Sequence, residues 1–579
     1  MKKYVADLFT RIFSWSQAHL DLLIILSALL VSSTPLFKPS MYLIHDFTHG
    51  ARISEMSLAL KDGHFPVRWS KNFGFGYGMP LFQFYGPLPF YLGSLIFFLL
   101  GDILFSVKFL FFLSSFFTFL GGYLLGKSIF RSRWSGLITS IAVGLAPYRF
   151  LNLYIRGALN ELWGMMAIIW ILCALRLVVD RVKNSWLLLS VSMIVLFLSH
   201  NLSSLIFAPF FLISLAIFLQ LRRSQKKPNK HFYLQVTKEV GVATVLAVGV
   251  SAFYLFPAYL EKDFTQYQSY VLADYFNFRT HFVYIKQLLR PNWGFGGSIL
   301  GPNDPISFFL GFGQLFGLLI AIISWTLLTI KKEFSHTKKF LLFLFPFGLS
   351  SIMSTHYGQF IWEMLPLLEI VQFPWRFLSL ATIFLALILG WVGLVTGNGK
   401  KGVVIKTLMI SACLLNLIFV RPEGYLLDAT EVYRDDSSLT KDEISQYLPD
   451  YIPQQLKTRD HPGSLLTVEE QFLGDFQVVA DKTHFKQIEI QTTSPSKIIL
   501  NIADYPGWRV YLNNSLHQHS TAHNGEISVK VPKGKNNLII KFQSTTIRRA
   551  SDLISFLSAG VLLFLLLRMF HKSKNANRC

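Results

Sequence analysis

The stretch Phe105–Leu125, FSVKFLFFLSSFFTFLGGYLL, decides the fold class of this chain. It runs for 21 residues with a single charged side chain, Lys108. A bilayer core about 30 Å thick requires roughly 20 apolar residues in one helix, so this stretch is long enough to cross a membrane. Comparable apolar blocks lie at Leu22–Leu36, Met165–Val179 and Leu553–Leu567. The sequence therefore predicts an α-helical protein that crosses the membrane many times.

The composition of the whole chain excludes an ordinary soluble protein. Of its 579 residues, 52% are hydrophobic and 15% are charged, and the mean hydropathy is +0.43. Soluble domains carry about 25% charged residues. Two of the three cysteines, Cys173 and Cys413, lie inside apolar blocks, and the third is the last residue, Cys579. We therefore expect no disulfide framework.

The basic residues indicate how the chain lies in the membrane. The formal net charge is +21, and a basic protein can bind nucleic acid. Here, however, the positive charge is divided among short loops between apolar blocks, which is the positive-inside pattern of cytoplasmic loops. These loops are Lys127/Arg131/Arg133, Arg181/Lys183, 222–230, 331–339, Lys400/Lys401 and 568–574. We expect the lipid bilayer as a partner and no nucleic acid.

Placing every basic loop in the cytoplasm gives one consistent topology. It has about twelve spans, with both termini in the cytoplasm and the first span retained rather than cleaved as a signal peptide. The apolar stretch Pro87–Gly101 would invert the later loops if it crossed, so we interpret it as a re-entrant or juxtamembrane helix. The predicted spans are 20–37, 104–126, 134–150, 160–179, 186–200, 202–220, 240–258, 305–330, 340–353, 377–397, 403–420 and 551–569.

The chain is predicted to divide into three regions in the cell membrane. Residues 1–420 form the membrane domain, with exterior loops at 38–103, 259–304 and 354–376. Residues 421–550 form an exterior β-rich domain, and residues 551–579 form a last span with a basic cytoplasmic tail. Short alternating segments separated by turns predict a β-sandwich-like fold. These segments are Lys497–Ile502, Trp508–Leu512, Glu526–Val531 and Asn537–Phe542.

The first exterior loop carries the strongest candidate for chemistry, His45-Asp46-Phe47-Thr48-His49. A carboxylate at the outer membrane surface can deprotonate an acceptor hydroxyl or hold a divalent cation. Asp46 and His49 are three residues apart, so one helical turn would bring them together, and we expect both as catalytic residues with His45 beside the substrate. Alternatively, Asp46 is the N-cap of a helix predicted over Ala51–Leu60.

This loop also contains a candidate metal ligand. Asp46 is a candidate ligand for Mg²⁺ or Mn²⁺. A dedicated zinc site is not indicated, because the chain has neither an HExxH motif nor paired cysteines. The glycines Gly74, Gly76 and Gly78 follow no strand–helix unit and precede no Lys-Ser/Thr, so they predict a tight turn rather than a nucleotide site.

Further polar residues gather at the predicted outer ends of other spans. Ionisable groups at membrane depth are costly unless they line a cavity or pair, so a cluster of them marks a site. We expect Glu161 as a catalytic residue, and arginines near tryptophan can grip a lipid-linked phosphate. Each arginine or tryptophan can equally be an interfacial anchor. The substrate-binding candidates are Arg149, Arg156, His356, Tyr357, Trp375 and Arg376.

The β-rich domain offers one further candidate, the Pro-Gly-Trp turn at 506–508. Trp508 and Tyr511 are residue types that stack on sugars. A Pro-Gly-Trp turn is equally typical of a buried core tryptophan.

Several motifs resemble a family of bacterial polytopic membrane proteins. The chain resembles the YfhO-like kind, and most nearly the group called "6-pyruvoyl-tetrahydropterin synthase-related". That name implies no pterin chemistry here, because the zinc-binding histidine triad of the soluble synthase is not matched. The motifs are His45–His49, Phe65–Trp69, Gly76–Pro80, Phe84–Pro89, Arg156–Glu161, Gln372–Phe377 and Tyr505–Tyr511.

The architecture is also similar to the GT-C class of glycosyltransferases. That resemblance implies a sugar carried on a polyprenyl phosphate, Asp46 as base or metal ligand, and Arg376 or Arg156 as phosphate grip. The class often has paired acidic residues in this loop, whereas Asp46 lies between His45 and Phe47.

Two functions follow from these observations. The first is an exterior glycosyltransferase of the cell envelope, which transfers a sugar to an acceptor that the sequence does not identify. The alternative is a non-enzymatic transporter or flippase of lipid-linked or polymeric envelope components. A transporter typically has internal repeats and broken mid-membrane helices, which the sequence does not clearly display.

Overall fold

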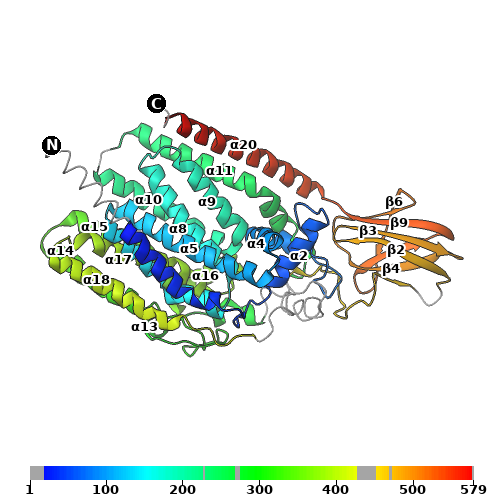
Figure 1. Cartoon of the computed structure of the whole chain (residues 1–579), viewed down its shortest axis with the longest axis horizontal. Coiled ribbons are helices and arrows are strands. Elements are labelled where there is room, and N and C mark those ends of the chain that lie inside the picture. Colours follow the sequence, from blue (N-terminus) through cyan, green and yellow to red (C-terminus); the bar gives the residue numbers. More distant parts are fainter. Residues whose placement is uncertain (1–18, 226–227, 268–273, 427–450, 469–471, 577–579) are drawn as a thin grey trace.

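A bundle of long helices and a β-sandwich make up the structure, a computed structural model that describes residues 19–225, 228–267, 274–426, 451–468 and 472–576. The sandwich lies at one end of the bundle, which we call the sandwich end (Figure 1). The helix α20 starts beside the sandwich and runs along α11 toward the opposite end (Figure 1). The mostly helical fold and the C-terminal antiparallel sheet domain confirm the predicted fold class.

The helices follow the apolar blocks of the sequence, with short polar connections. After the helix His19–Ser32 they are α2 (His49–Lys61), α3 (Leu81–Phe84), α4 (Leu88–Leu100), α5 (Ile103–Phe130), α6 (Arg133–Gly144), α7 (Pro147–Phe150), the π-helical turn η2 (Leu151–Ile155), α8 (Leu159–Val179), α9 (Ser185–Ser199), α10 (Asn201–Gln225), α11 (Lys230–Leu260), α13 (Ile285–Leu289), α14 (Phe312–Ile330), α15 (Phe334–Ser354), α16 (Gln359–Met364), the 3₁₀ turns η7 (Pro366–Val371) and η8 (Pro374–Phe377), α17 (Leu378–Val395), α18 (Lys400–Leu414) and α20 (Thr546–Ala576).

The predicted count of twelve spans is not confirmed. Within the described residues, eight helices are long and apolar enough to cross a membrane. A ninth span is added if α6 and the segment Pro147–Ile155, which meet at a 43° bend, are one broken span. The helix His19–Ser32 and α9 occupy predicted spans but are shorter, and α15 is not among the eight.

The segment that we interpret as re-entrant, Pro87–Gly101, forms the short helix α4. Thirteen residues at 1.5 Å each extend for about 20 Å, less than the thickness of the bilayer core. Gly101 ends α4 in the left-handed conformation, and the Asp102 side chain then caps α5 by accepting the Phe105 N–H at 2.9 Å. The chain therefore turns sharply between α4 and the long helix α5.

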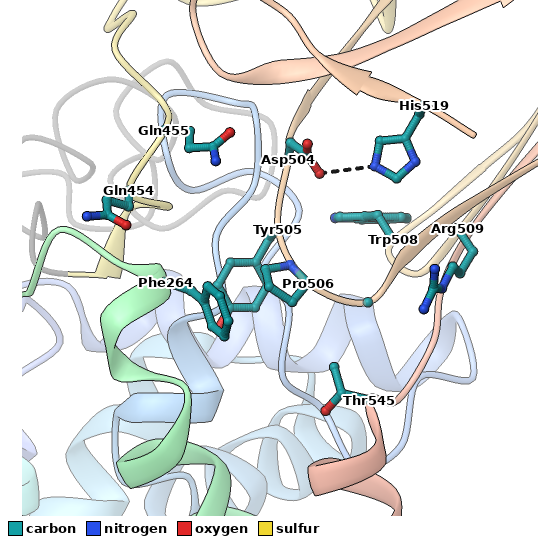
Figure 2. A pocket seen from close by; sticks show the side chains of 11 residues that line it. Phe264, Gln454, Gln455, Asp504, Tyr505, Pro506, Trp508, Arg509, His519 and Thr545 are labelled. Atoms are coloured by element: carbon teal, nitrogen blue, oxygen red, sulfur yellow. Dashed lines mark hydrogen bonds and ion pairs between the residues drawn. The ribbon is translucent and has the colours of Figure 1, made fainter. Parts of the chain in front are cut away.

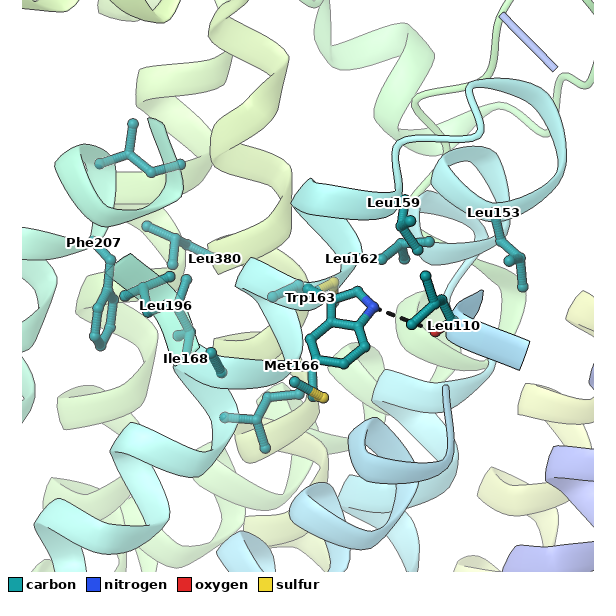
Figure 3. Packing of buried hydrophobic residues seen from close by; sticks show 14 of the residues in the cluster. Leu110, Leu153, Leu159, Leu162, Trp163, Met166, Ile168, Leu196, Phe207 and Leu380 are labelled. Carbon is teal, nitrogen blue, oxygen red and sulfur yellow. Dashed lines mark hydrogen bonds between the residues drawn. The ribbon is translucent and has the colours of Figure 1, made fainter. Parts of the chain in front are cut away.

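The centre of the bundle is formed by α8 and α17. In α8, and in α17 together with η8, 89% of the most apolar 18 residues are buried, whereas in α20 only 11% are. Figure 3 shows Trp163 of α8 within this packing, with its indole N–H directed at the carbonyl of Leu110 in α5, 3.3 Å away. Because α20 exposes most of its apolar surface, we assign it to the periphery of the bundle.

The C-terminal domain consists of two antiparallel sheets whose inner faces pack together. The alternating pattern is clear in β3, where Ile488 and Ile490 are buried. The turn Asn513-Asn514 joins β5 to β6, with both residues at positive φ as a tight hairpin requires. One sheet has the order β1 (Leu466–Val468), β4 (Ser496–Ala503), β8 (Glu526–Val531), β7 (Ser520–Thr521), and the other β2 (Gly474–Lys482), β3 (Phe485–Thr492), β9 (Gly534–Phe542), β5 (Trp508–Leu512), β6 (Ser515–His517).

The sandwich occupies 466–542, a narrower range than the predicted domain 421–550. The start of that predicted domain pairs with the membrane domain instead. The Leu43 N–H donates to the carbonyl of Gly424 at 3.0 Å, and the Leu426 N–H donates to the carbonyl of Met41 at 2.7 Å. These bonds place residues 424–426 beside the first loop, just before Asp46.

Candidate functional site

The first loop and the turn before α8 are joined by three hydrogen bonds. The backbone N–H groups of His45 and Asp46 donate to the carbonyls of Ile155 and Arg156, each at 2.9 Å. The third bond joins Nε2 of His49 to the carbonyl of Gly157 at 2.5 Å. These contacts place the predicted acid, Asp46, directly beside the predicted phosphate-binding residue, Arg156.

The helix predicted over Ala51–Leu60 is present but starts two residues earlier, at His49, and Asp46 is not its N-cap. The helix α2 begins at His49, and its N-cap residue is Thr48. The Thr48 hydroxyl donates to Oδ1 of Asp46 at 3.1 Å, so the carboxylate receives a bond from the cap residue instead of capping the helix. The Asp46 side chain thus lies outside the helix with its oxygens available to other groups.

Four side chains surround the Asp46 carboxylate. Besides Thr48, these are Arg52, whose Nη1 is 3.3 Å away, His49 at 3.6 Å and the Tyr85 hydroxyl at 3.4 Å. Burial raises the pKa of Asp46, but the charges of Arg52 and Arg156 and the hydrogen bond from Thr48 outweigh that effect, so the pKa lies below its ordinary value. Asp46 is therefore ionised at neutral pH, and 29% of its side chain remains exposed.

The two histidines of the loop are neutral at physiological pH. Burial, and then the charge of Arg156, lowers the pKa of His45 to about 4. Burial also lowers the pKa of His49, against the opposing effect of Asp46. Because a neutral ring that bonds a carbonyl must do so through N–H, we assign the proton of His49 to Nε2. His49 therefore holds the loop in place and does not accept a proton at that nitrogen.

Arg52 belongs to the site but was not among the sequence candidates. Its guanidinium lies 4.0 Å from the centre of the Tyr85 ring, and the residue is 1% exposed. The available signal was its position inside the predicted helix, three residues after His49 and thus on the same face.

A second group of charges surrounds Glu161 at the start of α8. Its Oε1 accepts the Tyr148 hydroxyl at 2.6 Å and the Asn152 amide at 3.3 Å. Its Oε2 accepts Nη1 of Arg156 at 2.8 Å and lies 3.7 Å from Nε of Arg376. Glu161 is thus the shared counterion of two arginines from different parts of the chain.

Trp375 supports these arginines rather than anchoring the protein at the membrane surface. It is 3% exposed, and the Arg156 guanidinium lies 4.3 Å from the centre of its ring. The Arg376 side chain donates to the carbonyl of Val371 at 2.6 Å. We call Asp46, Arg52, Arg156, Glu161 and Arg376 the charged cluster.

Three predicted site residues lie apart from the charged cluster. The Arg149 side chain donates to the carbonyl of Gly144 at 2.6 Å and to the Ser115 hydroxyl at 2.8 Å, which directs it toward α5. The His356 ring stacks on Tyr284 with the centroids 4.7 Å apart, and Tyr357 is 57% exposed. These contacts place Arg149 in the helix packing and His356 and Tyr357 in the loop after α15.

The residues around Asp46 do not fit a metal ion. Both carboxylate oxygens face donor groups, and Nε2 of His49 is bonded to the carbonyl of Gly157. Within the part of the chain that the structure describes, no three His, Cys, Asp or Glu side chains are grouped as ligands. Asp46 is therefore not assigned as a ligand of Mg²⁺ or Mn²⁺.

A separate pocket of about 350 Å³ lies between the sandwich and the membrane domain. Figure 2 shows Asp504 paired with His519 above Trp508, with Gln454 and Gln455 on the opposite side. Trp508 is only 2% exposed and packs edge-on against Trp69, 5.4 Å away. This burial favours the core interpretation of the Pro-Gly-Trp turn.

Comparison with known sequences identifies the family. Residues 82–423 match the family described as "6-pyruvoyl-tetrahydropterin synthase related domain; membrane protein". The chain belongs to this family of membrane proteins. An uncharacterized protein of Lactococcus lactis subsp. cremoris (strain MG1363) is 24% identical over 242 residues, which cover 41% of this chain and 38% of that protein. The chain thus matches well under half the length of this relative.

Two solved structures resemble this member of the synthase-related family at low similarity. The oligosaccharyltransferase of Archaeoglobus fulgidus in the apo form is 16% identical, with a TM-score of 0.42, over 78% of this chain and 62% of that one. The arabinofuranosyltransferase AftD from Mycobacteria is 14% identical, with a TM-score of 0.40, over 70% of this chain and 27% of that one. At a TM-score below 0.5, neither likeness indicates a function for this chain.

Proposed function

We propose that this protein is a membrane glycosyltransferase that transfers a sugar from a polyprenyl-phosphate donor to an acceptor outside the membrane. The observation that carries the proposal is the excess of positive charge in the charged cluster. Three guanidiniums, those of Arg52, Arg156 and Arg376, face two carboxylates, those of Asp46 and Glu161. An uncompensated buried charge is costly, so a bound anion stabilises the cluster.

Arg376 is the arginine best placed to receive that anion. Its Nε is buried and has no hydrogen-bond partner among the described residues, and its nearest carboxylate oxygen, 3.7 Å away, is already bonded to Arg156. Arginine binds phosphate through parallel N–H groups, which a point charge cannot do. We therefore assign the donor phosphate to Arg376 and Arg156, beside the Trp375 ring.

The proposed reaction needs one bond formed, one broken and one proton moved. The acceptor oxygen attacks the anomeric carbon as the bond from that carbon to the phosphate oxygen breaks. The polyprenyl phosphate leaves with the electron pair of that bond, and the arginines stabilise the charge that develops on it. The acceptor proton passes to the partly exposed Asp46 carboxylate.

A carboxylate of low pKa is adequate for this step. The transition state of glycosyl transfer resembles an oxocarbenium ion, and the attacking hydroxyl becomes strongly acidic as its new bond forms. A base that remains ionised at all physiological pH values can therefore accept the proton late in the reaction. The ion pair with Arg52 and the hydrogen bond from Thr48 keep Asp46 ionised and oriented, and they lower its basicity.

The outer location of this chemistry is also part of the proposal. It rests on the basic loop at Arg131–Arg133, which follows the last residue of α5, whereas the first loop lies near the start of that helix. A helix of 28 residues extends for about 42 Å, enough to separate the two membrane surfaces. With the basic loop in the cytoplasm, Asp46 and the sandwich lie outside and both termini inside.

The test is sugar transfer in membranes from cells that express each variant. Polyprenyl phosphates bearing different radiolabelled sugars are supplied, and label is followed from the lipid extract into the glycan fraction. Asp46→Asn should abolish the transfer that the wild type performs, while Asp475→Asn, at an exposed acid of β2, should retain it. Equal transfer by wild type and Asp46→Asn would refute the role of Asp46. No transfer by the wild type would overturn the proposal and favour the transporter.

A further inference from the structure

A small polar pocket lies where the first loop, the sandwich and the start of α20 meet. Its volume is about 140 Å³. It lies beside the motif Phe65–Trp69, to which the proposed reaction assigns no role. The residues that form most of it are Gly63, His64, Phe65, Arg68, His484 and Arg548.

Five nitrogen atoms of these side chains are buried without a hydrogen-bond partner in the described part of the chain. They are Nδ1 of His64 and His484, Nε of Arg68, and Nη1 and Nη2 of Arg548. Arg548 is 0% exposed, Arg68 4% and His64 8%. Buried donors left unpaired are costly, so the pocket favours a ligand that brings several acceptor oxygens.

The two arginines are held in place by carboxylates that do not line the pocket. Nε of Arg548 donates to Glu261 at 2.8 Å, and Nη2 of Arg68 donates to Asp552 at 2.5 Å. Neither carboxylate is among the residues that line the pocket. The remaining donors are thus fixed in position, and none of the described residues that line the pocket is an acid that would repel an anion.

We propose that this pocket binds a phosphate group, either that of a phospholipid headgroup or free inorganic phosphate. The two histidines contribute hydrogen bonds rather than charge. Burial, followed by the neighbouring His484, Arg68 and Arg548, lowers the pKa of His64 to about 3, and the neutral ring can present an N–H at Nδ1. Phosphate presents the several acceptor oxygens that the five nitrogens require.

The surroundings of the pocket suit a lipid as the source of that phosphate. Phe65 lines the pocket, is 76% exposed and contacts Tyr91 of α4, with the ring centroids 6.1 Å apart. Farther along α4, Leu95 and Leu99 are also exposed. This apolar surface runs from the pocket along the helix, where acyl chains can pack.

The test measures ligand-induced stabilisation of the full chain, purified in a neutral detergent without added phospholipid. The ligands are inorganic phosphate, dihexanoyl phosphatidylglycerol as a phosphodiester lipid, and dihexanoylglycerol as its phosphate-free counterpart. A ligand that binds only the folded state raises the thermal midpoint in a concentration-dependent way. Because the charged cluster is also proposed to bind a phosphate, variants of the pocket histidines assign any stabilisation to this pocket. Failure of this proposal is thus distinguishable from failure of the glycosyltransferase proposal, which is tested by sugar transfer.

The decisive variant is His64→Phe/His484→Phe, which keeps two aromatic rings and removes two donors. We expect wild type to bind phosphate or the phosphodiester, and the double variant to bind on the order of tenfold more weakly or worse. The control His523→Phe, at an exposed histidine of the sandwich, should bind like wild type. Should the double variant not fold, His484→Phe alone is expected to weaken binding in the same direction.

The ligand arms identify the source of the phosphate. Stabilisation by inorganic phosphate as well as by the phosphodiester indicates a site for the phosphate group itself, and stabilisation by the phosphodiester alone indicates a lipid headgroup. The proposal is overturned if neither stabilises the wild type, if dihexanoylglycerol does so equally well, or if the histidine variants bind with unchanged affinity.

Discussion

Replacing Glu161 by glutamine is the most direct test of the charged cluster. The carboxylate is 3% exposed and is the shared counterion of Arg156 and Arg376. Glutamine preserves the acceptor that receives the Tyr148 hydroxyl but places either an N–H or a neutral oxygen against Arg156. Removing one partner of a buried ion pair costs about 3–5 kcal/mol, since the other charge remains buried. We expect a loss of folding free energy of about that size.

The assay is equilibrium unfolding of the detergent-solubilised protein, followed by tryptophan fluorescence. The matched control is Glu363→Gln. Glu363 pairs with Arg279 at 3.4 Å, but both side chains are more than two-fifths exposed, so this substitution should leave the unfolding midpoint unchanged.

A double variant separates charge from packing. Glu161, Arg156 and Arg376 together carry a charge of +1, which Glu161→Gln raises to +2 and Glu161→Gln/Arg156→Gln returns to +1. The double variant should therefore be more stable than the sum of its single changes predicts, by about 0.5–3 kcal/mol. A Glu161→Gln variant within about 1 kcal/mol of wild type would refute Glu161 as the counterion.

Two further predictions concern the segments that hold the two polar sites. Gly157→Ala should lower the thermal midpoint of unfolding more than Gly63→Ala does. Both glycines have positive φ, but a Cβ added at Gly157 would lie 2.5 Å from Ile44, whereas one added at Gly63 would have nothing within 4 Å. The free energy of unfolding should also fall as the pH drops from 6.5 toward 3, because His64 binds a proton at a higher pH in the unfolded chain than in the folded one. His64→Phe should lose less stability than wild type over this range, and equal losses would contradict the burial of a neutral His64.

The sequence predicted the long helices well, because twenty apolar residues without charge have few stable arrangements other than a span. It predicted one span at 134–150 where the structure has a break. Pro147 lacks the N–H that would continue α6 and its ring conflicts with the preceding turn, so the chain bends there and resumes as α7. The proline was visible in the sequence, but the direction of the bend depends on the helices that pack around it.

The charged cluster was predicted only in part, because an irregular helical turn separates two of the candidate arginines. Arg149 and Arg156 are seven residues apart, which in a regular α-helix places them on one face. The segment between them contains the π-helical turn η2, which has more residues per turn and so rotates the following side chains to a different face. Arg149 therefore points toward α5 and Arg156 toward Glu161. The periodicity of the sequence does not predict such a turn, so the sequence could not show which of the two arginines joins the cluster.

The way the site is assembled explains which of its contacts can change on binding. Three consecutive carbonyls, those of residues 155–157, accept hydrogen bonds from His45, Asp46 and His49, so the acid and Arg156 belong to one rigid unit. Arg376 comes from a separate part of the chain and meets that unit through the longest ion pair of the cluster, 3.7 Å. A phosphate that enters there replaces a weak contact and leaves the strong ones intact. In the proposed reaction, Asp46 and Arg156 are therefore in place before the donor binds, as efficient transition-state stabilisation requires, and Arg376 adapts to the donor.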